Sequence, residues 1–273
     1  QGLKILVKAK SLAIANEEKN SAYEIIELEK VIEAQYITRS ISSRADELTV
    51  QAKQLSQQNV LASKLSNLSL QLYGLFLKTG YVKDASEHEK VTKYFNDRLP
   101  VYNISKLGFR EKLWLYKSYL WFSFLTQDFL ACYKYSKKWV NLFHEYPGMI
   151  RLNPVFFLNG NQNLLEALFF VRQHGKFKEA LTNLIEITNE DWFPKDDNVQ
   201  SLTFLYVGSN KFNSHFMEGK FQEGLPLVAE TLEGIRKHKS RIDEHHIMVF
   251  YYKIASLYFG IGEHHKCIEF LSK

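Results

Sequence analysis

Apolar residues recur at spacings of three and four along most of the chain, a period typical of helices that bury one face. The stretch Leu164, Leu165, Leu168, Phe169 and Val171 shows this period clearly. Alternation of apolar and polar residues, which would indicate half-buried strands, is scarce. The pattern therefore predicts an all-α fold.

The first 60 residues contain three helical patterns but no clear turn phrase. Apolar spacing predicts helices over residues 3–15, 21–38 and 44–58, separated by polar segments at 16–20 and 40–43. We expect these helices to be degenerate repeats or to cap a larger array.

A short phrase recurs five times in the rest of the chain, at residues 80–85, 127–132, 175–180, 219–224 and 262–267. Its first residue is glycine, or once Gln127, which fits the left-handed conformation that ends a helix. Its last residue is small, and we expect it where two paired helices cross most closely. These last residues are Ala85, Cys132, Ala180, Gly224 and Cys267.

These phrases resemble the turn between helices A and B of the tetratricopeptide repeat, and the match is best over residues 160–273, with 175–180 the closest phrase. The resemblance implies a right-handed α-solenoid of about five to six antiparallel helix pairs, five of them recognisable in residues 61–273. The phrases are 43 to 48 residues apart, against about 34 in the family, so the helices or their connections are longer. We expect one helical-repeat domain over 1–273, cut from a longer protein.

The resemblance also implies a groove, because ligands of this family usually contact the inner face of the A helices. Counting back from each turn gives a face of mixed aromatic, amide and basic character, without the family's lysine and asparagine clamp for a terminal carboxylate. The candidate groove residues are Trp114, Lys117, Trp121, Gln162, Arg172, Asn213 and Tyr252. Lys117 and Arg172 favour a binding surface most, since a charge on an apolar face needs water or an anionic partner. Plain packing is the alternative for Trp121.

The net charge of +5 is concentrated in residues 98–153, which hold nine lysines and arginines against three acidic residues. Lys134, Lys137 and Lys138 fall on one side of a predicted helix and form a candidate patch for an anionic partner. A solvated outer face is the alternative. Nucleic acid is disfavoured as the partner, because no nucleic-acid-binding module is recognisable.

Catalytic motifs are missing from the sequence: it has no glycine-rich phosphate loop, no GxSxG, no HExxH and no CxxC. We therefore expect no enzyme activity, no catalytic residue, no metal and no cofactor. The two cysteines, Cys132 and Cys267, lie far apart and favour free thiols in a reducing, cytoplasmic compartment. No apolar run approaches the ~20 residues that cross a bilayer, so no membrane insertion is expected.

The sequence thus predicts a non-catalytic helical-repeat scaffold that binds a protein or peptide. Three alternatives stay open, one of which is an enzyme without a recognisable catalytic motif. The repeats also resemble the peptide-binding part of bacterial quorum-sensing regulators, which would make the chain the peptide-sensing domain of a transcriptional or signalling regulator. The chain could instead form homo-oligomers through its unfinished ends.

Overall fold

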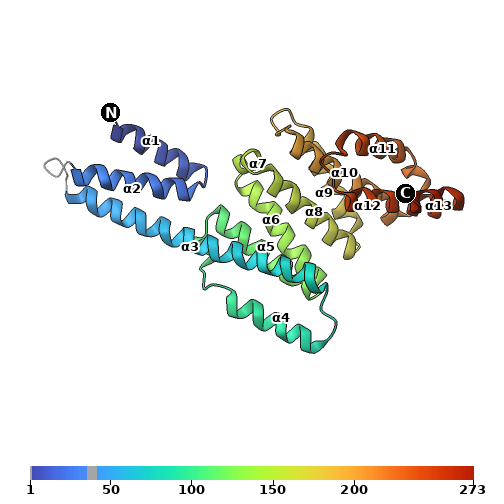
Figure 1. Cartoon of the computed structure of the whole chain (residues 1–273), viewed down its shortest axis with the longest axis horizontal. Helices are drawn as coiled ribbons and strands as arrows, with labels where there is room; N and C mark the ends of the chain where they lie inside the picture. The colour runs from blue at the N-terminus through green and yellow to red at the C-terminus, as the bar shows by residue number, and fades with distance from the viewer. Residues whose placement is uncertain (1, 36–41) are drawn as a thin grey trace. The chain divides into compact units, whose positions relative to one another are not determined.

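A computed structural model of the chain describes residues 2–35 and 42–273, in which helices alternate with short connections and no strand occurs (Figure 1). The predicted all-α class is confirmed. None of the helices in these two ranges is long and apolar enough to cross a membrane.

Backbone contacts divide the chain into two compact units. Unit 1 comprises Gln1–Ala131 and His144–Gly148, and unit 2 comprises Cys132–Phe143 and Met149–Lys273. The single domain expected over 1–273 stays a prediction.

Unit 1 begins with two helices and the long α3, and it continues with two further helices of the same lengths as the first two. Its elements are α1 (Gly2–Ala15), α2 (Lys19–Gln35), α3 (Ser42–Thr79), α4 (Ala85–Arg98), the 3-10 turn η2 (Ile104–Lys106) and α5 (Phe109–Leu125). The helix predicted over 3–15 is confirmed. The one predicted over 44–58 is part of the much longer α3, and residues 36–41, which include the end of the second predicted helix, lie outside the described part of the chain.

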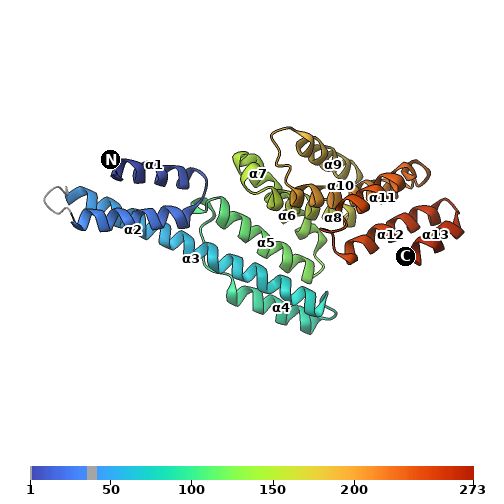
Figure 2. The same ribbon diagram turned by 45° about the horizontal axis from the view of Figure 1, so that its top comes forward.

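The long helix α3 packs against different neighbours along its length, as two views show (Figures 1 and 2). Its N-terminal half packs on α2, in a core cluster that includes Ala22, Ile26 and Leu48. Its C-terminal half packs on α4 and α5, where Leu72 and Phe95 are buried. Between the two clusters, α3 faces the loop that contains η2.

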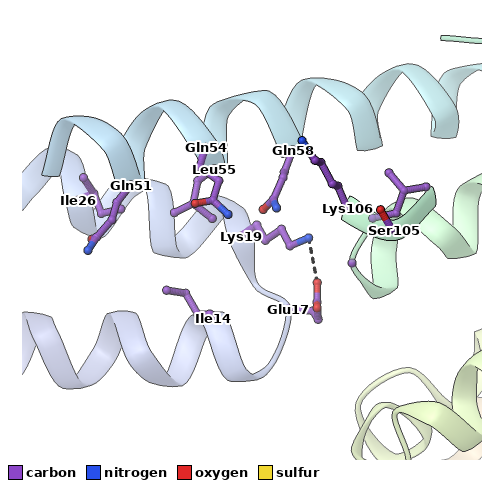
Figure 3. Close-up of a pocket in the computed structure, with 12 residues that line it drawn as sticks. Ile14, Glu17, Lys19, Ile26, Gln51, Gln54, Leu55, Gln58, Ser105 and Lys106 are labelled. Atoms are coloured by element: carbon purple, nitrogen blue, oxygen red, sulfur yellow. Dashed lines mark ion pairs between the residues drawn. The ribbon is translucent and has the colours of Figure 1, made fainter. Parts of the chain in front are cut away.

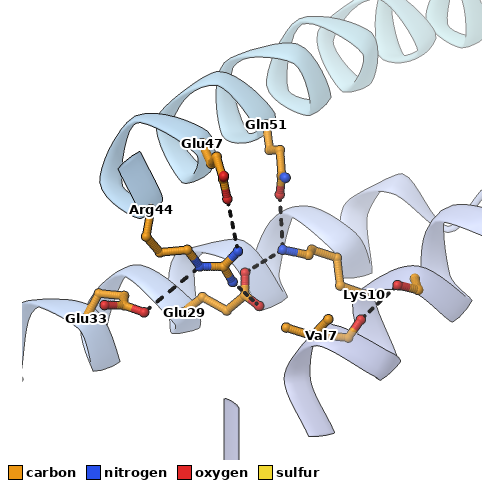
Figure 4. Close-up of polar contacts among 8 residues, drawn as sticks. Val7, Lys10, Glu29, Glu33, Arg44, Glu47 and Gln51 are labelled. Atoms are coloured by element: carbon orange, nitrogen blue, oxygen red, sulfur yellow. Dashed lines mark hydrogen bonds and ion pairs between the residues drawn. The ribbon is translucent and has the colours of Figure 1, made fainter. Parts of the chain in front are cut away.

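A buried ion pair joins the first three helices (Figure 4). The Glu29 side chain is fully buried, and its two oxygens accept from Lys10 Nζ at 2.6 Å and Arg44 Nη2 at 3.2 Å. Lys10 Nζ also donates to Gln51 Oε1 at 3.0 Å. Because Lys10 is the one buried residue of α1, this contact fixes how α1 lies on α2 and α3.

Unit 2 is a succession of helices with one continuous apolar core near its C-terminal end. Its elements are most of α6 (Phe129–Glu145), α7 (Gly148–Leu152), α8 (Pro154–Phe170), α9 (His174–Asn189), α10 (Asp197–Glu218), the 3-10 turn η3 (Gln222–Gly224), α11 (Pro226–His238), α12 (Glu244–Gly260) and α13 (His264–Leu271). Phe212, Phe250 and Phe270 are the largest side chains of that core. Asp196 and Asp243 cap α10 and α12 by accepting from backbone N–H groups at 3.1 and 2.8 Å.

Four of the five predicted turn residues adopt the left-handed conformation. Gly80, Gln127, Gly219 and Gly262 have φ angles of 69°, 57°, 68° and 81°. The turn predicted at the third phrase, residues 175–180, is wrong. Residues 175–180 lie inside α9, and the left-handed residue that ends α8 is Arg172, with φ of 53°.

The small residues at the ends of the phrases differ in burial. Cys132 and Cys267 are buried free thiols, as expected. Gly224 lies at a close approach of two helices, since a Cβ atom there would come within 2.5 Å of Leu257 Cδ1. Ala85, however, is exposed, so close helix crossing does not explain the small residue in the first phrase.

Candidate functional site

A cavity of about 390 Å³ with both polar and apolar lining opens in unit 2 between α8, α10 and α12. It is lined by Gln162, Glu166, Phe169, Phe170, Leu205, Tyr206, Ser209, Asn213, His245, His246, Val249, Phe250 and Lys253. On each helix these residues recur every three or four positions, so each helix presents one face to the cavity. Aromatic rings form part of the wall, and amide and charged groups provide the hydrogen-bonding capacity.

Hydrogen bonds join polar side chains of all three helices in one row. Lys253 Nζ donates to Asn213 Oδ1, Asn213 Nδ2 donates to Asn210 Oδ1 at 3.1 Å, and Asn210 Nδ2 donates to Gln162 Oε1 at 2.7 Å. Asn210 is fully buried, and its amide also donates to the Tyr206 carbonyl at 2.8 Å. A connected row of this kind holds its members in fixed orientations, so the cavity presents a preset pattern of donors and acceptors.

Two opposite charges share this cavity. Burial raises the pKa of the Glu166 carboxyl, and the charge of Lys253 opposes that rise. Burial likewise lowers the pKa of Lys253 to about 8, against the effect of Glu166. Among the ion pairs of the described residues none joins these two side chains within 4.0 Å, so both could contact a ligand group placed between them.

The pKa of Lys253 leads to a test by titration. We expect NMR of ¹³C-labelled lysine side chains to give midpoints near pH 8 for Lys253 and Lys117, because burial lowers both pKa values to about 8, whereas exposed lysines titrate near 10.4. Replacement of each by arginine assigns its signal. Since the folded-state pKa lies below the unfolded value, folding stability should rise as the pH increases from about 8 to about 10.4. Midpoints near 10.4 would contradict the burial of both ammonium groups.

The structure brings together some of the sequence-predicted groove residues of unit 2. Gln162 and Asn213 line the same cavity and are linked through Asn210. Tyr252 instead lines a separate apolar hollow of about 570 Å³, with Phe221 and Phe259. Arg172 is exposed in the turn after α8 and does not line the cavity of unit 2.

The three predicted groove residues of unit 1 lie on α5. Lys117 is half-buried, and its Nζ lies 4.8 Å from the centre of the Trp114 ring, a cation–π distance. Trp121 packs among the rings of Tyr73, Phe76 and Phe124, with centroids 4.6 to 5.8 Å away. These contacts support the packing alternative for Trp121.

The predicted anionic-partner patch lies on α6. Lys134, Lys137 and Lys138 are exposed, and each has its Nζ within 6 Å of the ring centre of Tyr133 or Tyr135. Lys176 of α9 adds a fourth ammonium group, 5.4 Å from the ring centre of Tyr133, which was not predicted. The patch remains open to both of its interpretations, an anionic partner and a solvated face.

Sequence reasoning missed Glu166 and Lys253 as residues of the cavity. The miss at Glu166 follows from the misplaced third turn. Counting six back from Gly175 gives Phe169, whereas counting six back from Arg172, the actual turn residue, gives Glu166. No similar count would have found Lys253, which lies one residue beyond the predicted Tyr252 and faces the cavity that Tyr252 does not line.

Within residues 2–35 and 42–273, no group of three or more histidine, cysteine, aspartate and glutamate side chains is placed to hold a metal ion. Comparison with protein-family models, with curated proteins and with solved structures finds no match for this chain.

Proposed function

We propose that the chain is a non-catalytic helical-repeat scaffold that holds a protein or peptide segment in the cavity of unit 2. In this proposal the helix pairs are tetratricopeptide-like and stack as a right-handed α-solenoid. The observation that carries it is a row of hydrogen bonds among residues of three helices. Lys253 donates to Asn213, and the buried Asn210 links Asn213 to Gln162, so that three lining residues of the cavity are held in place. Side-chain amides can both donate to and accept from a peptide main chain, and the adjacent Phe169 and Tyr206 offer apolar area for its side chains.

The cavity supports binding of a segment more than binding of a compact small molecule. Its lining comes from one face of each of three successive A-type helices, α8, α10 and α12. In stacked helix pairs such faces form extended surfaces that suit peptides or helices of a partner. Trp114, Lys117, Trp121 and Arg172 stay predicted groove residues, and the cytoplasmic location stays a prediction.

Selection of short random peptides displayed on phage, with the full chain as bait, tests this function. Peptides retained by the parent chain should bind the Asn213→Leu/Lys253→Met variant about a hundredfold more weakly, because two hydrogen-bonding groups, one of them charged, are lost. Fluorescence anisotropy of the labelled peptides measures the change.

Lys237→Met is the matched control, since Lys237 is exposed on α11 and does not line the cavity. It should leave the affinity within about twofold of the parent value. If the retained peptides bound the double variant as tightly as the parent chain, the cavity of unit 2 would not be their site.

A further inference from the structure

The same backbone turn ends five helices of the described chain, and one of the five turns was not predicted. In each turn a residue with positive φ donates its N–H to the carbonyl three residues back, and the next residue donates to the carbonyl five residues back. The residues with positive φ are Glu17, Gln127, Arg172, Gly219 and Gly262. Glu17 is the unpredicted one, and Figure 3 shows it paired with Lys19, whose Nζ lies 3.2 Å from Glu17 Oε2. The pair α1 and α2 is therefore joined in the same way as the pair α12 and α13.

The distance along the chain from this turn identifies the face by which α12 packs on α10. The residues of that face lie twelve, nine and five positions before Gly262 and are Phe250, Lys253 and Leu257. The Phe250 ring centre lies 5.1 Å from that of Phe204, and Lys253 donates to Asn213. Leu257 packs on Gly224, where a Cβ atom would come within 2.5 Å of Leu257 Cδ1. Phe250 is 1% exposed and Leu257 is 0% exposed.

The helix α1 has the same types of residue at the same three positions, but there they are exposed. The residues twelve, nine and five positions before Glu17 are Ile5, Lys8 and Leu12. Ile5 is 67% exposed and Leu12 is 64% exposed. Of the five helices that end in this turn, only α1 and α12 have an apolar residue, a lysine and an apolar residue at these positions. The helix α1 therefore presents to solvent a face like the one that α12 buries against α10.

A second surface of α12 is left uncovered in the same register. The apolar hollow of about 570 Å³ contains the residues ten, six and three positions before Gly262 and five positions after it, which are Tyr252, Ser256, Phe259 and Cys267. Tyr252 and Phe259 are each 65% exposed. The residues at these positions relative to Gly219 all face α12, and they are Ser209, Asn213, Phe216 and Gly224. The hollow beside α12 therefore corresponds to the place that α12 itself takes beside α10.

We infer that the hollow beside α12 binds α1 of a second copy of this chain, in the position that α12 takes beside α10. The occupant is a copy of this chain because α1 matches α12 in residue type at all three contact positions. Leu12 then lies on Cys267, which is the counterpart of Gly224. The Lys8 ammonium group lies beside the Ser256 hydroxyl, which can accept a hydrogen bond from it.

Each copy has both surfaces, so the contact joins copies head to tail. Contacts between two different surfaces build chains or rings that are larger than a dimer. A single helix in a hollow covers less than the ~800 Å² per partner of a standard stable interface, so we expect association at roughly tens of micromolar. The contact uses no lining residue of the cavity of unit 2 and does not rest on the proposed function.

Sedimentation velocity of the full chain between about 1 and about 200 µM tests this contact. The average mass should rise with concentration and pass that of a dimer. The variant Ile5→Glu/Leu12→Glu removes the α1 surface, and Tyr252→Glu/Phe259→Glu removes the hollow. Each variant alone should associate at least about tenfold more weakly than the parent chain, because a charge is placed in an apolar contact. An equimolar mixture of the two variants should form dimers and nothing larger, since it keeps one intact pair of surfaces.

The matched control is Val50→Glu/Leu70→Glu. These two residues of α3 are 65% and 68% exposed and lie outside both surfaces, so this variant should associate as the parent chain does. The variant Leu12→Cys tests the contact without adding a charge. Under mild oxidation it should form a disulfide with Cys267 of a second copy, which peptide mapping identifies. A parent chain that stays monomeric at about 200 µM, a mixture without dimers, or Leu12→Cys without this disulfide overturns the inference.

Discussion

Replacement of Glu29 by leucine is expected to lower the free energy of unfolding of unit 1 by about 3–5 kcal/mol. The Glu29 carboxylate is fully buried and pairs with Lys10 and Arg44. Without it the Lys10 ammonium stays buried, with 8% of its side chain exposed, and has no opposite charge beside it. Removing one partner of a buried ion pair destabilises a protein by much more than the intact pair stabilises it.

Hydrogen exchange read by mass spectrometry measures this change, because it gives the opening free energy of α1 and α2 separately from the rest of the chain. The double variant Lys10→Met/Glu29→Leu is the control. It also removes the buried ammonium group of Lys10. It should therefore recover most of the lost free energy of unfolding, since Arg44 can turn toward solvent. A loss below about 1 kcal/mol in the single variant would show that this ion pair does not hold α1 in place.

Replacement of Trp139 by alanine is expected to lower the stability of unit 2 by about 3–5 kcal/mol. Trp139 is 1% exposed, and its ring packs against α8 at Gly160. A Cβ atom on Gly160 would lie 2.9 Å from the ring, so the two residues fit only as a pair. Protection of the α6 and α8 amides against hydrogen exchange measures the loss.

Gly160→Leu provides the complementary control. On its own it should also destabilise α8, because the added side chain collides with the Trp139 ring. Combined with Trp139→Ala it should destabilise much less than the two separate losses together, since the leucine occupies the space left by the ring. Additive losses would contradict direct packing of Trp139 on Gly160.

The helical class followed from sequence because apolar spacing reports directly which face of a helix is buried. Turn positions followed where glycine marks them, as at Gly80, Gly219 and Gly262. The third turn could not be found in that way, because Arg172 adopts the left-handed conformation, which costs a residue with a side chain roughly 1–2 kcal/mol.

The candidate site was predictable only in part. Asn213 was found because it lies six residues before the turn at Gly219. Gln162 was predicted by counting from the misplaced turn at Gly175, and it lines the cavity because it also lies ten residues before the actual turn residue, Arg172. Lys253 was not, since the rotation of α12 about its axis depends on how its apolar residues, such as Phe250 and Ile254, pack in the core. Tertiary packing sets this rotation, and the sequence spacing alone does not show it.

The most direct test of the central claim, that the cavity of unit 2 receives a partner segment, is photo-crosslinking from inside it. Benzoylphenylalanine placed at Ser209, which lines the cavity, should crosslink to a peptide selected on the parent chain, whereas the same group at the exposed Ser240 should not. A crosslink at Ser209 that disappears in the Asn213→Leu/Lys253→Met background is the predicted result. Equal crosslinking from both positions, or none from Ser209, would contradict the claim.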